Sequence, residues 1–372
     1  MKNIIKRIIN FLFMIFKIDE KRILFECGRG MIDGSPKAVY DYLKNKHPNE
    51  YKLMWIVNKD TDVTGLDKKD YCYVNTIKSF YERAISKYWL KSESIASLIK
   101  KRKKQVYIQL WHGHGALKKM GYDVIENKTG EPLEHTKEWD YLIVNDPLDE
   151  KIMISSTGYQ GNILMIGTPL TDSILINSKR SKFKKDILKK LNINNDNPII
   201  LYAPTFRDDD LDKETIDLRI NRLKEIKDYT ILLRVHPLVR NKIDETLFED
   251  SNIINVCKYP DSSDLLSITD ILISDYSSII YEYSILNKPI VFYAYDLEKY
   301  GKERGFYLKY PEDLPGVTVY TEDELYNAIT NIKKDFKSYN KKLNTFNKKY
   351  NSLNDGKVCD RFYKLLKEGY FK

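Results

Sequence analysis

Short apolar runs that stop abruptly at polar or glycine-rich turns recur along this chain, and segments of helical periodicity lie between them. The runs of the first half lie at 23–26, 52–57, 71–74, 106–110, 141–144 and 163–166, and those of the second half at 198–202, 230–234, 253–256, 271–273 and 289–293. Strands that alternate with helices indicate βαβ units and a mostly parallel sheet. The pattern pauses after Gly167 and then restarts, so we expect an α/β chain with two doubly wound halves.

Helical segments connect these strands in both halves. Apolar spacing and charge predict helices at 37–46, 80–89, 179–190, 322–332 and 334–366, and a weak strand or helix at 94–99. The length of 372 residues favours two or three domains, at about 150 residues each. We expect an N-terminal helix at 1–17, a first domain at 18–172, and a second domain at 173–372 that ends in a charged helical tail.

Composition limits the classes of protein that this chain can represent. A hydrophobic content of 42% can supply real cores, which is not typical of a disordered chain. The net charge of +9 favours an anionic partner such as phosphate, nucleic acid or acidic lipid, and a solvated lysine-rich surface explains it equally well. Four cysteines lie far apart without a CxxC pair. This spacing argues against a zinc module or a disulfide scaffold and is typical of a reducing cytoplasm.

The first 17 residues combine Lys2, Lys6 and Arg7 with an apolar run at 8–16. This run is too short to span a bilayer, which needs about 20 apolar residues. It also lacks the small-residue cleavage site of a signal peptide. A basic, aromatic-rich helix that lies in the headgroup plane of a membrane fits this composition, and a first helix docked on the protein's own core is the alternative. Any membrane contact through residues 1–17 is therefore expected to be peripheral.

One strand-like run ends in a turn of hydroxyl side chains. The run Ile271–Ile273 stops at Asp275, and Ser277 and Ser278 follow before a helical pattern begins. Serine and aspartate are favoured there because their oxygens satisfy the unpaired N–H groups of a helix start. A strand, a hydroxyl-rich turn and a helix N-terminus together favour the binding of an anion.

Two histidines also follow strand-like runs, and the first of them is His112. It precedes Gly113, and a glycine at this position lets a substrate approach the backbone closely. An imidazole there can act as a general base on a hydroxyl, since its pKa lies near the working pH. A histidine hydrogen-bonded in a turn is the structural alternative. His114 can take the same role, and Lys118 and Lys119 can face either phosphate or solvent.

The second histidine, His236, lies between Arg234 and Pro237. Because proline disfavours helical geometry in the residue before it, His236 is expected on a loop, where it can bind a diphosphate or have no ligand. Another turn contains Arg207, which suits bidentate phosphate contact and can equally pair with Asp208 on the surface. Ligands bind beyond the carboxyl ends of strands in doubly wound sheets, so these turns indicate one phosphate-handling site.

The sequence lacks the motifs of several metal and nucleotide sites, with no HExxH, no GxSxG and no Walker P-loop. The five histidines show no metal-ligand spacing. Without a metal ion, a leaving nucleoside phosphate is neutralised by serine, histidine, arginine and helix dipoles. We therefore expect no metal and no cofactor.

A series of segments along the chain carries a family resemblance. These segments are Gln109–Gly113, Lys118–Gly121, Leu201–Asp208, Leu233–Leu238, Ser274–Ser278, Lys288–Pro289, Phe292–Glu298, Arg304–Tyr307 and Asp355–Gly356. Together and in this order they resemble the CDP-glycerol:polyol-phosphate glycerophosphotransferase family, the teichoic acid primases and polymerases. The resemblance covers roughly residues 20–366.

The resemblance implies a GT-B fold, with two Rossmann-like domains that face each other across a cleft. It implies transfer of glycerol phosphate or ribitol phosphate from a CDP-activated donor, without metal, to a hydroxyl of a membrane-anchored acceptor. The histidine of the family's Trp-His-Gly motif corresponds to His112, which implies the catalytic base. The histidine of its His-Pro motif corresponds to His236, and its paired serines correspond to Ser277 and Ser278, which implies contacts to the donor phosphate.

These observations lead to one expected function. We expect an enzyme, attached peripherally to the cytoplasmic face of the membrane, that takes a CDP-polyol donor and a prenyl-diphosphate-linked saccharide acceptor, releases CMP and binds no nucleic acid. The expected catalytic residues are His112 and His236, the donor-binding residues Arg207, Arg234, Asp275, Ser277 and Ser278, and the candidate acceptor-side residues His114, Lys118 and Lys119.

Two other functions fit parts of the sequence. A nucleotide-sugar glycosyltransferase of the same fold is the first alternative, because a fold does not fix its donor. A basic protein that binds nucleic acid or an anionic membrane is the second. The dispersed positive charge and the lack of a recognised nucleic-acid module argue against the second alternative.

Overall fold

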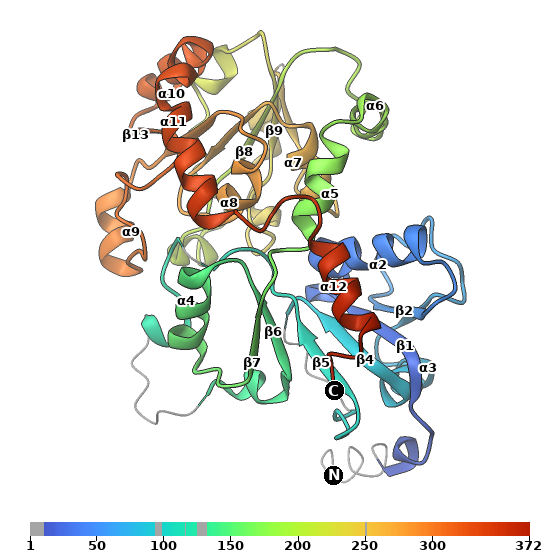
Figure 1. The fold of residues 1–372 in the computed structure, drawn as a ribbon. Helices are drawn as coiled ribbons and strands as arrows, with labels where there is room; N and C mark the ends of the chain where they lie inside the picture. The colour runs from blue at the N-terminus through green and yellow to red at the C-terminus, as the bar shows by residue number, and fades with distance from the viewer. Residues whose placement is uncertain (1–10, 94–98, 116, 125–131, 250) are drawn as a thin grey trace. The chain divides into compact units, whose positions relative to one another are not determined.

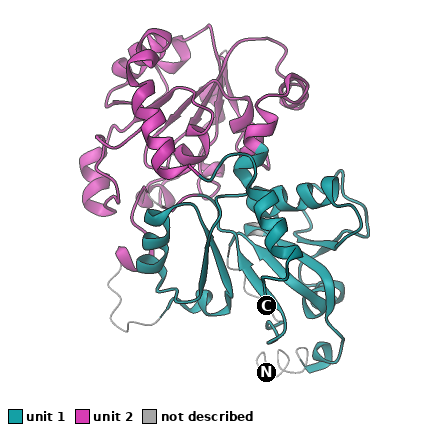
Figure 2. Ribbon diagram, in the orientation of Figure 1, with its two compact units in different colours: residues 1–113, 127–173, 353–372 teal, residues 114–126, 174–352 magenta. Residues whose placement is uncertain are grey.

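The computed structural model describes residues 11–93, 99–115, 117–124, 132–249 and 251–372 (Figure 1). The chain forms two compact units (Figure 2). Unit 1 comprises residues 1–113, 127–173 and 353–372, and unit 2 comprises residues 114–126 and 174–352. The main division therefore lies next to the expected boundary at residue 172. Two segments differ from the expected division, because 353–372 belong to unit 1 and 114–126 belong to unit 2.

Unit 1 is built on a seven-stranded parallel sheet with the order β3-β2-β1-β4-β5-β6-β7. Its strands are β1 (Asp19–Glu26), β2 (Lys52–Val57), β3 (Tyr71–Tyr73), β4 (Ser86–Lys91), β5 (Val106–Gln109), β6 (Tyr141–Val144) and β7 (Asn162–Met165). Its helices are η1 (Gly28–Gly30), α2 (Gly34–Lys46), α3 (Ile77–Ile85), η3 (Glu134–Glu138), α4 (Pro147–Thr157) and α12 (Val358–Lys367). The strand order reverses between β1 and β4, which is the point where ligands bind in doubly wound sheets.

The core of unit 1 joins the first strands of the chain to its last helix. Phe25 of β1 packs against Tyr40 of α2 and Trp55 of β2, with ring centroids 5.5 and 5.3 Å away. Phe362 and Leu366 of α12 belong to the same buried cluster. The helical tail predicted at 334–366 is therefore divided, and its second helix completes the core of unit 1 beside α2 (Figure 1).

The single helix predicted at 80–89 is wrong in its second half, because residues 86–91 form the central strand β4. This strand ends at Lys91, whose Nζ lies 2.8 Å from the carboxylate of Glu26 on β1. Arg83 of α3 pairs with the same carboxylate, and all three side chains are buried. A buried charge needs a partner of opposite charge, and here the fold brings that partner from another strand. The periodicity of the sequence alone therefore does not predict that Lys91 is buried at the end of a strand.

Unit 2 is built on a six-stranded parallel sheet with the order β10-β9-β8-β11-β12-β13. Its strands are β8 (Ile199–Ala203), β9 (Thr230–Leu233), β10 (Ile253–Asn255), β11 (Ile271–Ser274), β12 (Ile290–Tyr293) and β13 (Val317–Val319). Its helices are η2 (Gly121–Asp123), α6 (Ser181–Lys190), η4 (Asp208–Leu211), η5 (Leu223–Glu225), η6 (Arg240–Lys242), η7 (Glu245–Phe248), α7 (Ser262–Ile268), α8 (Ile279–Ser284), α9 (Leu297–Glu303), α10 (Glu322–Thr330) and α11 (Ile332–Tyr350), and α5 (Leu170–Asn177) connects the units. Its strand order reverses between β8 and β11.

Every apolar run predicted as a strand overlaps a strand of the structure, whereas β4 and β13 were not predicted. Each unit is a doubly wound parallel sheet with helices, so the expected α/β, GT-B-like fold class with two Rossmann-like sheets is confirmed. The hydrophobic cores follow from this pattern, because strands such as β8 and β11 are buried along their whole length.

Most of the expected N-terminal helix lies outside the described residues. Residues 11–14 are helical, and the side chains of Phe11, Leu12 and Ile15 are exposed. In the part of the chain that the structure describes, we find no helix with the length and apolar character to cross a bilayer. The weak element predicted at 94–99 also lies almost entirely outside the described residues.

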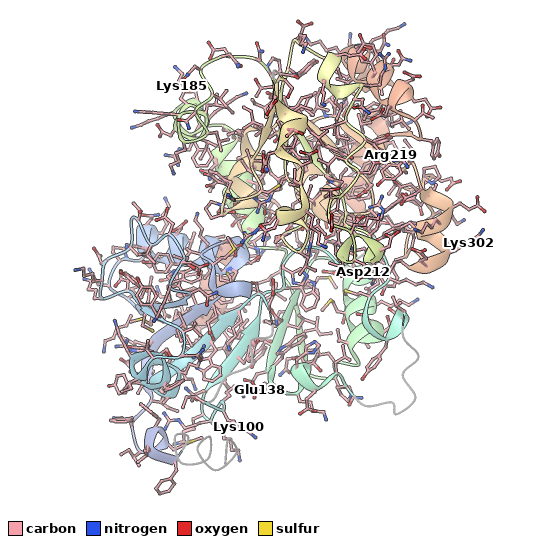
Figure 3. The ribbon with its side chains drawn as sticks, turned by 180° about the vertical axis from the view of Figure 1, so that it is seen from behind. Lys100, Glu138, Lys185, Asp212, Arg219 and Lys302 are labelled. Atoms are coloured by element: carbon pink, nitrogen blue, oxygen red, sulfur yellow. The ribbon has the colours of Figure 1, made fainter. Side chains whose placement is uncertain are left out.

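Charged side chains of both signs lie on the surface of each unit (Figure 3). The labelled and exposed examples are Lys100 and Glu138 of unit 1, and Lys185, Asp212, Arg219 and Lys302 of unit 2. This mixture of signs supports the interpretation of the net positive charge as a largely solvated surface.

Candidate active site

The candidate site of unit 2 is organised around Asp275, which follows β11 at the point where the strand order reverses. Its Oδ1 accepts hydrogen bonds from the backbone N–H of Thr205 (2.8 Å) and from that of Tyr276 (2.6 Å). Its Oδ2 accepts a hydrogen bond from Nη1 of Arg207 at 3.0 Å. The carboxylate is buried, and these bonds fasten the turn after β11 to the turn after β8.

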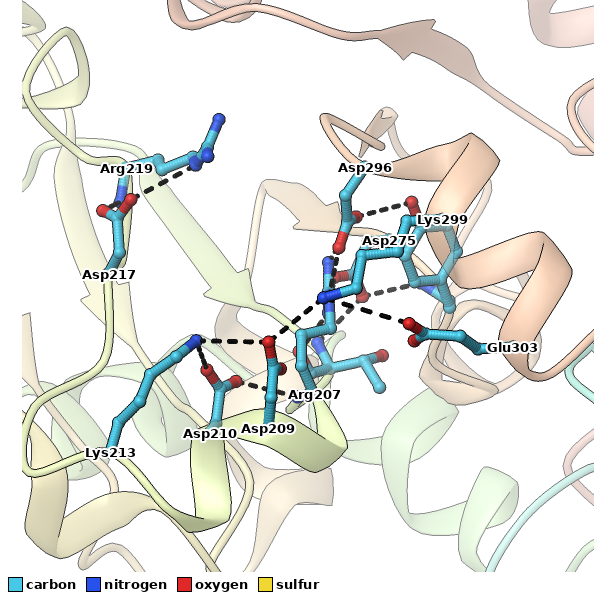
Figure 4. A network of polar contacts seen from close by, with 12 residues as sticks. Arg207, Asp209, Asp210, Lys213, Asp217, Arg219, Asp275, Asp296, Lys299 and Glu303 are labelled. Atoms are coloured by element: carbon cyan, nitrogen blue, oxygen red, sulfur yellow. Dashed lines mark hydrogen bonds and ion pairs between the residues drawn. The ribbon is translucent and has the colours of Figure 1, made fainter.

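Arg207 is the centre of a second set of contacts (Figure 4). Its Nε and Nη2 donate to the two carboxylate oxygens of Asp296 at 2.7 and 2.8 Å, in the bidentate geometry that guanidinium favours. The rings of Tyr276, Tyr295 and Tyr300 lie 5.0 to 5.2 Å from the guanidinium carbon. Burial lowers the pKa of Arg207, but the two carboxylates outweigh burial and hold the pKa above its ordinary value.

The sequence predicted Arg207 and Asp275 as direct contacts of the donor. In the structure they bond to each other and to Asp296, so their charges are largely satisfied within the protein. The sequence analysis did not assign a role to Asp296, although it lies in the segment Phe292–Glu298 that carries the family resemblance. A cavity of about 570 Å³ opens beside this residue and is lined by residues 294–299 and Tyr320.

Asp296 also links the stability of unit 2 to pH. Burial raises the pKa of its carboxyl, but Arg207 outweighs burial, so the pKa lies below its ordinary value of 3.8. Because the pKa of Asp296 is lower in the folded chain than in the unfolded chain, its ionised carboxylate stabilises the fold above pH 3.8. This stabilisation is lost as the pH falls through the folded pKa. We expect the free energy of unfolding to decrease below about pH 4, with a smaller slope in Asp296→Asn. Denaturant titrations across this pH range, with the exposed Asp212→Asn as control, measure both slopes; an unchanged slope in Asp296→Asn contradicts the assignment.

The two serines lie directly after this cluster. Ser277 Oγ accepts a hydrogen bond from the N–H of Ile279 at 3.3 Å, and the hydroxyl of Ser278 does not cap α8. Both side chains are partly exposed. The buried Asp275 therefore lies next to a turn whose two serine side chains are partly exposed and accessible to a ligand.

His236 follows β9, which is the neighbour of β8 on the other side. Its ring centroid lies 4.6 Å from that of Phe206. Phe206 belongs to the turn after β8, together with Thr205 and Arg207. The N–H of Leu238 donates to Nδ1 of His236 at 3.3 Å. The structure therefore brings His236 and the Arg207–Asp275 turns to the carboxyl edge of one sheet, as the sequence predicted.

Arg234 has a structural contact that the sequence analysis did not foresee. Its Nη1 donates to the backbone oxygen of Tyr259 at 2.6 Å, which ties the loop after β10 to the turn after β9. A role in donor binding stays a prediction for this residue.

His112 lies in the turn after β5 in unit 1 and is exposed. Its Nδ1 lies 3.4 Å from the backbone oxygen of Ser92, which follows β4. The preceding Trp111 has a φ of +53° and stacks on the imidazole with a centroid distance of 4.4 Å. A left-handed backbone costs a non-glycine residue roughly 1–3 kcal/mol and is typical of functional turns.

The three candidate acceptor-side residues belong to unit 2. His114 is buried, its ring stacks on that of Tyr281 at 3.9 Å, and its N–H donates to Glu282 at 3.0 Å. Lys118 and Lys119 lie on the segment that follows. Along the chain, Gly113 alone lies between His112 and His114, the first residue of the unit 2 segment.

An acidic run, Asp208–Asp210, follows the β8 turn, and each of its carboxylates has a basic partner. Arg304 pairs with Asp208 (2.5 Å), Lys299 with Asp209 (3.1 Å) and Lys213 with Asp210 (2.8 Å). These pairs are at least partly exposed, and pairs of this kind contribute little to stability. Among the described residues, no group of three histidine, cysteine or acidic side chains has the arrangement of a metal site.

Comparison with known proteins identifies the family. The model of the CDP-Glycerol:Poly(glycerophosphate) glycerophosphotransferase family matches residues 8–368. The teichoic acid glycerol-phosphate transferase of Staphylococcus aureus is 32% identical over 98% of this chain and 100% of its own length. The teichoic acid poly(glycerol phosphate) polymerase of Staphylococcus epidermidis is 34% identical over 94% of this chain, which spans only 52% of that relative.

The solved structures agree with these relatives. The wall teichoic acid polymerase TagF superposes with a TM-score of 0.86 at 31% identity, covering 99% of this chain and 95% of that chain. A variant of TagF soaked with CDPG gives a TM-score of 0.87 at 30% identity, with the same coverage. The chain therefore belongs to the CDP-Glycerol:Poly(glycerophosphate) glycerophosphotransferase family, the transferases of teichoic acid biosynthesis.

Proposed function

We propose that this chain transfers glycerol phosphate or ribitol phosphate from a CDP-activated donor to a hydroxyl of a lipid-linked acceptor and releases CMP. Membership of the family supports the reaction class. The residues expected to hold a diphosphate gather at the carboxyl edge of the unit 2 sheet, where doubly wound sheets bind their ligands.

The main support for this proposal is that the hydrogen bonds of His112 and His236 favour opposite imidazole tautomers. The backbone oxygen of Ser92 lies 3.4 Å from Nδ1 of His112, and only the tautomer with its proton on Nδ1 and its lone pair on Nε2 can donate to that oxygen. An N–H, that of Leu238, donates to Nδ1 of His236 at 3.3 Å, so this neutral ring has its proton on Nε2. The first form suits a general base, and the second suits a hydrogen bond to a phosphate oxygen.

In the proposed step the acceptor hydroxyl attacks the β-phosphorus of the CDP-polyol. A new P–O bond forms, the bond from that phosphorus to the bridging oxygen breaks, and CMP leaves with the electron pair. The hydroxyl proton passes to Nε2 of His112. His236 and the hydroxyls of Ser277 and Ser278 donate to the phosphate oxygens on which charge develops. Arg207 is a positioning residue in this scheme.

Nucleotide release distinguishes this function from that of a nucleotide-sugar glycosyltransferase. The full chain is incubated with CDP-glycerol, CDP-ribitol or UDP-sugars and a synthetic prenyl-linked acceptor, in the presence of EDTA. We expect acceptor-dependent release of CMP from a CDP-polyol, because the proposed step uses no metal. Release of UDP alone supports the glycosyltransferase, and activity that EDTA removes contradicts the metal-free step.

We also propose peripheral attachment to the cytoplasmic face of the membrane, where nucleotide-activated donors are available. The exposed side chains of Phe11 and Ile15 support this attachment. The ring of Phe16 packs on that of Tyr81 at 5.0 Å, and Ile77 on the same helix is also exposed, so apolar side chains from two elements share this part of unit 1. Exposed apolar groups at this density are typical of a contact surface.

The variant Phe11→Ser/Ile15→Ser is expected to bind anionic vesicles about a hundredfold or more less tightly than the unchanged chain, because each lost apolar side chain weakens insertion by roughly 1.5–3 kcal/mol. Sedimentation with phosphatidylglycerol vesicles measures the bound fraction. Ile154→Ser, at another exposed apolar position of unit 1, is the control. Equal sedimentation of both variants refutes the attachment through this segment.

A further inference from the structure

We propose that Lys118 is a ligand of the donor diphosphate on unit 2. This inference rests on the proposed function and replaces the expectation that Lys118 lies on the acceptor side. Two observations support it. The backbone of the segment that follows His112 is hydrogen-bonded to unit 2, and this segment lies beside the charged groups of the donor site.

The segment is fixed by an antiparallel pairing. Lys118 forms a bridge with Phe306, the N–H of Lys119 donates to Gly305 at 3.1 Å, and the N–H of Tyr307 donates to Leu117 at 2.9 Å. The hydroxyl of Tyr307 secures the next turn, because it accepts a hydrogen bond from the N–H of Met120 (3.3 Å) and donates to Asp123 (2.5 Å). The backbone of Lys118 is therefore held on unit 2.

The pairing places Lys118 beside the turn after β11, because the ring of its bridge partner Phe306 lies 5.5 Å from that of Tyr276, which follows Asp275. Burial lowers the pKa of Lys118 most, Asp275 raises it, and Arg304 and Arg207 lower it. Asp275 and Arg207 are the residues that join the turns after β11 and β8, so Lys118 lies at the same carboxyl edge of the sheet as Ser277. Both oxygens of Asp275 already accept hydrogen bonds from other groups.

Within the described part of the chain, the ammonium of Lys118 has neither a hydrogen bond nor an ion pair. The side chain of Lys118 is partly exposed, so its ammonium is accessible to an entering ligand, and it lies beside residues whose charges already balance one another. An anion that enters the site supplies the missing partner. The oxygens of a diphosphate accept strong hydrogen bonds from an ammonium, and Lys is a common phosphate ligand of this kind.

Lys119 provides a matched control. Successive residues of an extended segment point to opposite sides, so Lys119 faces away from Lys118. Its stem packs along the backbone of Gly305, where its Cδ lies 3.2 Å from the position that a Cβ would occupy. Replacement of either lysine by methionine removes the same charge and keeps a similar apolar stem.

The test measures CDP-glycerol binding by calorimetry, and thermal unfolding, for K118M, K118R and K119M. We expect K118M to weaken binding at least tenfold, as for loss of one charged hydrogen bond, roughly 1.5–3 kcal/mol, while K119M stays within about twofold. K118R is expected to recover most of the affinity, and K118M to lower the salt dependence of binding. Because K118M removes an unpartnered ammonium, its Tm is expected to equal or exceed that of the unchanged chain.

The outcomes separate this inference from the function on which it rests. If the unchanged chain neither binds nor turns over a CDP-polyol, the proposed function fails. If the unchanged chain does so and K118M binds as tightly as K119M, only the role of Lys118 is overturned. Weaker binding of K118M together with a lower Tm also overturns it, because that pair of results indicates a structural residue.

Discussion

Replacement of His112 by alanine is expected to reduce turnover by a factor on the order of 10² or more, because general-base catalysis contributes roughly 10²–10⁴. Binding of the donor is expected to stay unchanged, since the donor contacts that we propose lie on unit 2. The imidazole is exposed, so its replacement is expected to leave the fold intact.

Initial rates of CMP release, together with CDP-glycerol affinity and thermal unfolding, measure these three expectations for His112→Ala. His135→Ala is the control, because this histidine is exposed on η3 of the same unit. His114→Ala provides a contrast, since loss of the ring that stacks on Tyr281 is expected to lower stability as well as activity. Near-normal turnover in His112→Ala removes this residue from the mechanism.

Replacement of Arg207 by methionine is expected to destabilise unit 2 by about 3 kcal/mol or more, because it leaves two carboxylates without their cation. Asp275 is almost completely buried and Asp296 has 18% of its side chain exposed, so water replaces the lost contacts poorly. Each kcal/mol moves the Tm of a domain of this size by roughly 2–4 °C, so the expected decrease is roughly 6 °C or more.

Thermal and denaturant unfolding measure this loss in Arg207→Met, with Lys302→Met as control because that lysine is 75% exposed. The combined change Arg207→Met/Asp275→Asn/Asp296→Asn is expected to recover part of the stability, since it removes the unpaired charges. Arg207→Lys is not expected to restore the wild-type stability, because one ammonium cannot reproduce the bidentate bond to Asp296. A destabilisation no greater than that of Lys302→Met contradicts the role of Arg207 as the link between the two turns.

The fold was largely predictable because most of its strands are continuous apolar runs that end at polar turns. The strand β4 was not, since Tyr88–Leu90 continue the apolar residues of α3 and the strand ends in a charged lysine. That lysine is buried only because Glu26 arrives from β1. The packing position of α12 was also not predictable, because periodicity predicts the helix but does not show that Phe362 packs into the core of unit 1.

The candidate site was predictable in its residue types and only partly in its contacts. The position after a strand was sufficient to select His112, His236 and Asp275. It did not show that Asp275 and Arg207 neutralise each other, because both are also plausible ligand contacts when read alone. The same limit applies to Lys118, whose place on unit 2 depends on pairing with a segment that lies far away in the sequence.

The central claim is that this chain moves a polyol phosphate from a CDP-activated donor to a hydroxyl acceptor. Mass spectrometry of a synthetic prenyl-diphosphate-linked saccharide, incubated with the full chain and CDP-glycerol or CDP-ribitol, tests it most directly. We predict an acceptor that has gained one or more polyol phosphates, with one CMP released for each unit added. An acceptor of unchanged mass with both donors, or one that gains a sugar from a UDP-sugar instead, would contradict the claim.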